Sequence, residues 1–219
     1  IIFDEFFRFF SALELVKDRE EQALNHYIIP MEEPVKRFVE NLPYPLTGAQ
    51  KKVLNEIRQD FSDTMAMNRL LQGDVGSGKT IVAMTAMYAA VLAGYQAALM
   101  APTEVLAEQH YQNFVKLLSP LGITVALLTG STKAKEKREI KAACASGEIQ
   151  ILIGTHTVIQ DDVAFDNLAF IVTDEQHRFG VKQRDAFMKK GKDPHVLVMS
   201  ATPIPRTLGI ILYRDLDVS

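Results

Sequence analysis

Short hydrophobic runs alternate with longer amphipathic stretches along most of the 219-residue chain. The runs are almost continuously apolar, and the stretches between them carry apolar residues at helical spacing. This alternation is typical of βαβ units, whose parallel strands are buried on both faces of a sheet. We therefore predict an α/β fold with a doubly wound, mostly parallel sheet. The expected strands are 69–72, 95–102, 123–130, 149–156, 168–175 and 195–202.

Helices are expected between these strands. Thr103 precedes one amphipathic stretch, which is typical of a helix N-cap, and Gly94 follows another, which is typical of a helix end. Thr47 and Gln50 have the spacing of a capping box, so a further helix should begin at that point. The expected helices are 46–61, 81–94, 103–118 and 133–147.

The N-terminal part of the chain has a different pattern. Residues 3–25 carry apolar side chains at helical spacing with charged residues on the other side, so we expect an amphipathic helix that needs a partner surface. Prolines interrupt residues 30–45 and leave room for one or two helical turns at 35–42. We place a domain boundary between this helical extension, 1–44, and the main domain, 45–219.

Composition narrows the class of protein. Hydrophobic residues make up 47% of the chain, the net charge is −3 and the isoelectric point is near 6.0. The overall charge does not indicate a nucleic-acid-binding protein, so any contact with DNA must depend on local placement of charge. No apolar run approaches the roughly 20 residues that span a bilayer, so we expect no membrane association.

The single cysteine, Cys144, permits no internal disulfide and suggests a reducing compartment, so we expect a cytoplasmic protein. It lies in an Ala-rich helical stretch without a nearby histidine partner, which favours a packing residue over a nucleophile. The first residues carry acids and lack the basic region of a signal peptide, so we expect no signal peptide there. The chain also begins without Met, so we expect a piece of a longer protein. Nothing in the pattern requires more than a monomer.

A glycine-rich segment after the first predicted strand carries the clearest chemistry. Residues 73–80 fit the phosphate-loop spacing G-x-x-x-x-G-K-[ST] at every fixed position. Glycines let the backbone turn so that successive N–H groups surround an anion, and a helix beginning there adds its dipole. Lys79 can then contact the β- and γ-phosphates of ATP, and the Thr80 hydroxyl can bind Mg²⁺. The expected nucleotide-binding residues are Gly73, Asp74, Val75, Gly76, Ser77, Gly78, Lys79 and Thr80.

Acidic residues follow the apolar run 168–173, at the end of the strand predicted at 168–175. We expect Asp174 to face a Mg²⁺ ion held by Thr80 and the phosphates, through water molecules that the ion retains. Glu175 is expected to orient and activate the attacking water, and exposed acids in a turn are the alternative interpretation. Gln176 and His177 could relay the state of the γ-phosphate, although a lone histidine is usually structural.

Other polar residues also follow predicted strands. The last strand ends in Ser200-Ala201-Thr202, whose hydroxyls could hydrogen-bond the acidic group or cap a following helix. The basic stretch 133–141 is more typical of a solvated helix face than of a DNA-binding patch. Three further loops could bind phosphates through N–H and hydroxyl groups, although helix caps have the same composition. Their candidate residues are Thr103, Gly130, Thr155 and His156.

Gln50 has two interpretations. It could cap its own helix, or its amide could form a two-pronged hydrogen bond with adenine, whose N6 and N7 match an amide oxygen and nitrogen. The local pattern alone favours neither.

In their order along the chain, GDVGSGKT, APTE, GTHT, DEQH and SATPIPRT resemble the first motor domain of a superfamily 2 helicase. The longer stretches MAPTEVLAEQHY, DEQHRFGVKQR and SATPIPRTL resemble the RecG family of bacterial branched-DNA translocases. The resemblance covers about residues 45–219, and residues 1–44 look like the helical linker between wedge and motor in that family. The related Mfd translocases share HRFGV and TPIPRTL but usually have DEEH, and Phe where Ser77 stands, and PriA-like helicases lack HRFGV.

The resemblance implies a RecA-like ATP-binding domain of a DNA helicase that uses ATP and Mg²⁺ and acts on branched or forked double-stranded DNA in recombination and repair. It favours adenine recognition by Gln50. It implies catalytic roles for Lys79, Asp174 and Glu175, with Thr80 and Asp174 at the metal. Residues implied to couple hydrolysis to DNA movement are Gln176, His177, Ser200, Ala201 and Thr202, and those implied to face DNA are Thr103, Gly130, Thr155 and His156.

The resemblance also implies that a wedge domain and a second RecA-like domain belong to the same parent chain. The second domain would supply an arginine finger, which contributes a factor of about 10³–10⁵ in rate, so this chain alone is expected to be nearly inactive. Other hypotheses are a nucleotide-gated binding module with little turnover and a transporter ATPase. A binding module would not need Glu175, and the sequence motif that transporter ATPases carry ahead of their catalytic acid is not present in this sequence. Stimulation of hydrolysis by DNA separates these hypotheses.

Overall fold

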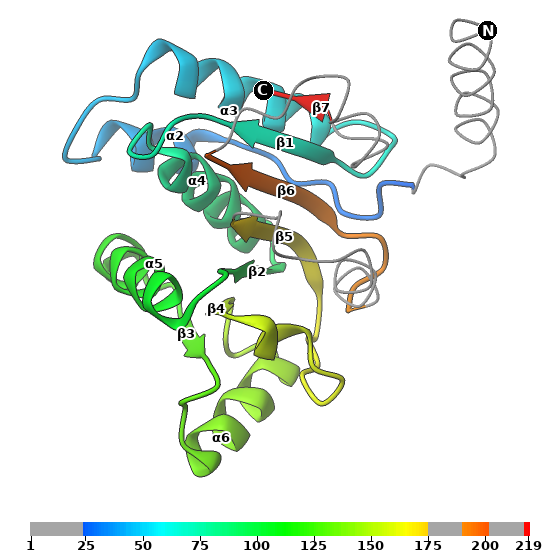
Figure 1. Ribbon diagram of the computed structural model, residues 1–219. Helices are drawn as coiled ribbons and strands as arrows, with labels where there is room; N and C mark the ends of the chain where they lie inside the picture. The colour runs from blue at the N-terminus through cyan, green and yellow to red at the C-terminus, as the bar shows by residue number, and fades with distance from the viewer. Residues whose placement is uncertain (1–23, 175–189, 202–216) are drawn as a thin grey trace, which may run out of the picture.

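The computed structural model describes residues 24–174, 190–201 and 217–219. Within them, a seven-stranded parallel sheet with the strand order β3-β4-β2-β5-β6-β1-β7 forms the centre of the molecule (Figure 1). Each strand expected from the sequence is present, so the predicted α/β fold is confirmed. The strands are β1 Asn68–Gln72, β2 Gln96–Met100, β3 Val125–Leu128, β4 Ile151–Gly154, β5 Leu168–Asp174, β6 His195–Ser200 and β7 Asp217–Val218.

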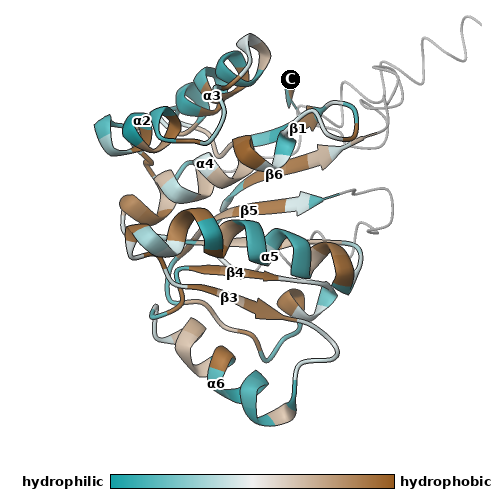
Figure 2. Cartoon of the chain, turned by 90° about the vertical axis from the view of Figure 1, so that its left-hand side faces the viewer, coloured by the Kyte–Doolittle hydropathy of each residue, from teal (hydrophilic) through white to brown (hydrophobic). Residues whose placement is uncertain are grey.

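Helices cover both faces of this sheet. Along β2, Ala97 and Leu99 belong to the core that also includes α3, α4 and α5, whereas Ala98 and Met100 belong to the core that includes α6. Successive strand residues point to opposite faces, so both sides of the strand are apolar, as Figure 2 shows for most of the sheet. The helices are α2 Glu33–Glu40, α3 Gly48–Asp60, α4 Lys79–Leu92, α5 Glu104–Leu118 and α6 Ala134–Ala145, with 3₁₀ turns η1 Ser119–Leu121 and η2 His156–Ile159.

The helix α4, which follows the phosphate loop, is buried almost all round. Every residue from Ile81 to Val91 is buried, because the sheet lies on one side and α2 and α3 pack on the other. The rings of Phe38 in α2 and Tyr88 in α4 have centroids 5.1 Å apart. This surrounding contact explains why the helix is rich in Ala and Met and has little polar surface. It ends just before Gly94, which has the left-handed φ of +87° and was the predicted helix end.

The described part of the N-terminal extension packs on the main domain. Leu24 forms an antiparallel bridge with Met65, Tyr27 is almost fully buried, and Ile29 is completely buried. The predicted helix over 3–25 lies outside the described residues except for its last two, which are not helical. The boundary near residue 45 stays a prediction.

A buried histidine connects this segment to the sheet. His195, the first residue of β6, accepts a hydrogen bond from the Met67 backbone N–H through Nδ1, at 2.8 Å. Its Nε2 donates to the Tyr27 carbonyl oxygen, also at 2.8 Å. The acceptor role of Nδ1 requires a neutral ring, and burial lowers the pKa of His195.

The strand β7 covers the edge of β1. The Ser219 carbonyl accepts from the Gln72 backbone N–H at 2.9 Å, and the Ser219 backbone N–H donates to the Leu70 carbonyl at 3.0 Å. Arg69 donates to Asp60 and to the Ser219 hydroxyl, each at 2.6 Å. Residue 219 therefore lies directly beside the residue that precedes the phosphate loop.

Cys144 is completely buried in α6, and burial raises the pKa of its thiol to about 12. This agrees with the predicted packing role. None of the described helices is both long and apolar enough to cross a membrane.

Candidate active site

Three strand ends bring the predicted site residues to one edge of the sheet. The strand β6 lies between β1 and β5, with Ser200 paired with Gln72 and Met199 paired with Asp174. Parallel strands are about 4.8 Å apart, so Asp174 lies roughly 10 Å from the start of the phosphate loop. The carboxyl edge therefore holds the phosphate loop, Asp174 and Ser200 together, where this class of fold binds ligands.

The phosphate loop uses its glycines for different reasons. Gly76 and Gly78 have left-handed φ angles of +83° and +82°, which residues with a Cβ rarely adopt. A Cβ on Gly73 would come within 2.7 Å of the Ser77 hydroxyl oxygen. The Ser77 backbone N–H donates to the Asp74 carbonyl at 3.1 Å and closes the turn. These contacts explain the spacing that the sequence shows.

Lys79 begins α4 and points back into the loop. Its ammonium donates to the Gly73 carbonyl at 2.6 Å and to the Asp74 carbonyl at 2.9 Å. An ammonium has three N–H donors, so it can hold two loop carbonyls and still donate to a phosphate oxygen. Thr80 follows in the first turn, where the helix N-terminus also favours an anion.

Gln50 contacts both its own helix end and the phosphate loop. Its Oε1 accepts from the Thr47 backbone N–H at 2.9 Å, and the Thr47 hydroxyl accepts from the Gln50 backbone N–H at 3.2 Å. The predicted capping box is therefore present. The Gln50 Nε2 also donates to the Ser77 carbonyl at 2.9 Å, a contact that the sequence pattern did not reveal.

Asp174 has a partner that the sequence analysis missed. Its Oδ2 lies 2.7 Å from Nε2 of His110, which is on α5. The buried positions of α5 are Ala107, His110, Phe114 and Leu118, so His110 occupies one position of an otherwise apolar stripe. Buried polar side chains are almost always hydrogen-bonded, so a histidine in this stripe was a signal for a partner.

Two of the loops predicted to face DNA are connected to each other. The Thr103 hydroxyl caps α5 by accepting from the Leu106 backbone N–H at 3.3 Å. Its neighbour Glu104 accepts a hydrogen bond from the Ser131 backbone N–H at 3.0 Å, next to Gly130. Hydrogen bonds from Ser131 lower the pKa of Glu104, so its carboxylate form is favoured. Glu104 was not among the predicted site residues.

The third of these loops follows β4. The Thr155 side chain is buried and its hydroxyl lies 3.4 Å from the Thr157 hydroxyl, whereas His156 is exposed. Contact with a ligand through the Thr155 hydroxyl would therefore need a rearrangement, and the loop offers its backbone and His156 instead.

The remaining predicted residues belong to the ends of β5 and β6. Ser200 is buried, and its carbonyl accepts from the Gly73 backbone N–H at 3.2 Å, which joins this strand end to the phosphate loop. Ala201 follows it. Four predicted site residues lie outside the described ranges: Glu175, Gln176, His177 and Thr202.

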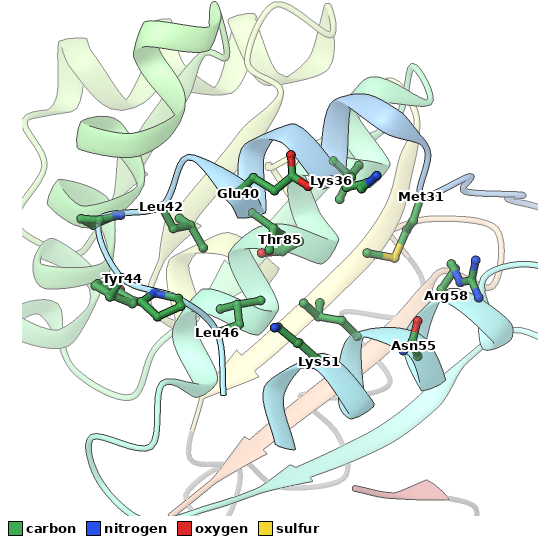
Figure 3. Close-up of a pocket in the computed structure, with 15 residues that line it drawn as sticks. Met31, Lys36, Glu40, Leu42, Tyr44, Leu46, Lys51, Asn55, Arg58 and Thr85 are labelled. Atoms are coloured by element: carbon green, nitrogen blue, oxygen red, sulfur yellow. The ribbon is translucent and has the colours of Figure 1, made fainter. Parts of the chain in front are cut away.

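A pocket of about 690 Å³ lies between α2, α3 and α4 (Figure 3). Apolar side chains such as Leu42 and Leu46 line it, and its charged lining residues are Lys36, Glu40, Lys51 and Arg58. Neither the phosphate loop nor Asp174 lines it. This pocket is therefore separate from the site at the carboxyl edge of the sheet.

The donors at the carboxyl edge suit Mg²⁺. Asp174 supplies carboxylate oxygens and Thr80 supplies a hydroxyl oxygen, and Mg²⁺ prefers oxygen ligands while keeping water and substrate phosphates. Among the described residues, no group of three or more His, Cys, Asp or Glu side chains forms a closed metal cage.

The sequence of this chain is similar to those of known helicases. Residues 47–210 match the sequence model of the DEAD/DEAH box helicases. Over its whole length the chain is 52% identical to the ATP-dependent DNA helicase RecG of Bacillus subtilis and 51% identical to that of Synechocystis sp.. It spans 32% and 26% of the length of these two relatives.

Solved structures show the same similarity. A structure of RecG bound to a three-way DNA junction matches 94% of this chain with a TM-score of 0.78 and 47% sequence identity, over 27% of that protein chain. The DUF1998 helicase MrfA matches 86% of this chain with a TM-score of 0.65 over 32% of its own chain, at 17% identity, which shows a shared fold alone.

Proposed function

The chain belongs to the DEAD/DEAH box helicase family, and on this premise we propose that it is the ATP-binding motor domain of an ATP-dependent DNA helicase acting on branched DNA. One observation carries the proposal: the phosphate loop, Asp174 and Ser200 meet at the carboxyl edge of the sheet. The RecG relatives, at about half identity over the whole chain, support the choice of DNA and of branched substrates. From the resemblance of the motifs, we propose that the whole protein serves recombination and repair.

The nucleotide would bind at the loop that joins β1 to α4. Loop N–H groups and the α4 N-terminus would receive the phosphates, and Lys79 would add a positive charge. Gln50 would hydrogen-bond adenine, because its contact with Ser77 holds its amide beside the loop. This assignment gives Gln50 both of the roles that the sequence left open.

Thr80 and Asp174 would hold Mg²⁺. The ion would supply positive charge that stabilises the phosphates during transfer to water. Glu175 would orient and activate that water as the catalytic base. The roles of Glu175, Gln176, His177 and Thr202 rest on the sequence, since these residues lie outside the described ranges.

Movement on DNA would require more than this domain. We propose that loops at Thr103, Gly130 and His156 face the DNA backbone, with Thr155 contributing main-chain atoms. A second RecA-like domain and a wedge domain in the same parent chain would complete a cytoplasmic, monomeric motor. Contacts to the backbone would make binding independent of base sequence and sensitive to salt.

Hydrolysis of ATP by the full-length protein that contains this chain tests the proposal. The rate is measured without DNA, with linear duplex and with forked DNA, and the Glu175→Gln variant serves as the blank. Strong stimulation by forks over linear duplex is the expected result. Equal stimulation by any duplex would indicate an Mfd-like translocase, and hydrolysis indifferent to DNA would contradict the helicase assignment.

A further inference from the structure

The hydrogen bond between His110 and Asp174 joins a helix to the predicted metal carboxylate. The two side chains come from residues 64 positions apart in the sequence, and their polar atoms lie 2.7 Å apart. Both are largely buried, with side-chain exposures of 9% and 14%. A hydrogen bond shielded in this way is stronger than one in water and holds its partners in fixed orientations.

The chemistry of the pair defines the donor. An ionised carboxylate only accepts hydrogen bonds, so His110 must carry a proton on Nε2 and donate it to Oδ2 of Asp174. The second carboxylate oxygen, Oδ1, keeps its acceptor capacity. The contact therefore leaves Oδ1 with its full acceptor capacity for another ligand and fixes the orientation of the carboxylate.

The histidine itself is held firmly. Ala107 and Phe114, which flank His110 in the buried stripe of α5, are both completely buried. The helix is capped by Thr103 and packs against β3 and β4, while Asp174 ends β5 within the same sheet. The imidazole thus forms a rigid link between α5 and the carboxylate.

We propose that His110 is a positioning residue that orients Asp174 for Mg²⁺. This inference rests on the proposed function, because it assigns Asp174 to the metal. Hydrogen-bonded partners of metal-binding carboxylates fix their orientation, and their loss typically weakens metal affinity or activity by about 10–100-fold. A histidine with only a packing role would affect stability but not the dependence of nucleotide binding on Mg²⁺.

Variants of the full-length protein test this role. His110→Leu fills a similar volume without a donor, and His110→Gln keeps an N–H donor. His26→Ala is the control, because His26 is partly exposed and its 3.8 Å contact is with Asp193, outside the candidate site. Binding of fluorescent ADP is titrated with Mg²⁺ and repeated in EDTA, and thermal unfolding is recorded for each variant.

We expect His110→Leu to raise the Mg²⁺ concentration for half-maximal enhancement of nucleotide binding about tenfold or more, with binding in EDTA unchanged. His110→Gln should restore part of the loss, and His26→Ala should match the wild type. Folded His110→Leu protein with the wild-type Mg²⁺ dependence would overturn the inference.

A measurement on the unmutated protein covers the case in which His110→Leu does not fold. With ¹⁵N-labelled histidine, the Nε2–H signal of His110 should shift when Mg²⁺ and ADP are added together and much less when ADP is added in EDTA. Equal spectra under both conditions overturn the inference. If the wild type binds no nucleotide at all, the result contradicts the proposed function. It is thereby distinguished from a result that contradicts only the role of His110.

Discussion

At Gly78 two independent constraints exclude a side chain. Its φ of +82° is left-handed, and a Cβ there would come within 2.2 Å of Gln50 Nε2. Relieving the second constraint would break the contact between Gln50 and Ser77, which holds the amide beside the phosphate loop. Gly78 therefore allows the backbone conformation of the phosphate loop and also leaves space for the Gln50 side chain.

Gly78→Ala should reduce nucleotide affinity by at least tenfold, because it combines left-handed strain of about 1–2 kcal/mol with displacement of Gln50. Gly122→Ala is a matched control, since Gly122 has a φ of +81° and open space around its Cβ position. Both variants are compared by thermal unfolding and by titration with fluorescent ADP. Similar losses of affinity in the two variants would show that the effect does not depend on the position of Gly78 beside Gln50.

The N-terminus of α3 connects helix stability to the nucleotide site. One side chain, Gln50, completes the capping box with Thr47 through its oxygen and contacts the phosphate loop through its nitrogen. The helix end and the loop therefore share a residue. Changes at the cap can be separated from changes at the loop because Thr47 takes part only in the first contact.

Thr47→Ala should lower the free energy of unfolding by about 1 kcal/mol through loss of the cap, with little effect on the preference for ATP over GTP. Gln50→Ala should cause a similar loss of stability and should also reduce that preference about tenfold, because adenine loses its amide partner. Competition binding with both nucleotides measures the preference. An unchanged preference in Gln50→Ala would exclude a role of Gln50 in adenine recognition.

The pattern of the strands was sufficient to predict the sheet. Runs such as β5, whose residues Leu168 to Thr173 are all buried, are apolar on both faces, which only a covered parallel sheet explains well. The phosphate loop and Asp174 followed from spacing and from their place after strands. The contacts of His110 and Glu104 did not, because each partner lies far away in the sequence and the pairing depends on how α5 packs.

The sequence also did not predict that residues 24–46 pack on the main domain. Tyr27 and Ile29 lie near prolines and show no helical or strand periodicity, so nothing local indicates that they are buried. Their partners belong to distant parts of the main domain: Tyr27 contacts Tyr95 and His195, and the Ile29 backbone N–H donates to the Phe61 carbonyl. A boundary placed from composition therefore does not reveal where packing continues across it.

At the scale of the whole molecule, His195 connects three distant segments. It bridges Met67 before β1 and Tyr27 in the extension while it begins β6. Burial lowers its pKa from the ordinary value of 6.5, so the native state binds a proton less readily than the unfolded chain. The contribution of neutral His195 to the free energy of unfolding is therefore complete above pH 6.5. It is lost as the pH falls below 6.5 and through the lower pKa of the native state.

We therefore expect the free energy of unfolding, measured in urea between pH 8 and pH 5, to decrease below about pH 6.5. His195→Gln should be less stable at pH 8 and should lose much of this pH dependence, because the amide does not titrate. His26→Ala, at a partly exposed histidine, should keep the wild-type dependence. A wild-type slope retained in His195→Gln would assign the effect to other groups.

The pairing of β7 with β1 allows a fluorescent label to be placed close to the candidate nucleotide site. Val218 is exposed, and the next residue hydrogen-bonds Gln72, immediately before the phosphate loop. A cysteine at position 218 could be labelled selectively, because the native Cys144 is buried and its pKa of about 12 leaves little thiolate. A dye attached there would lie close enough to the loop to serve as a reporter of nucleotide exchange, turning a short edge strand into the basis of a biosensor.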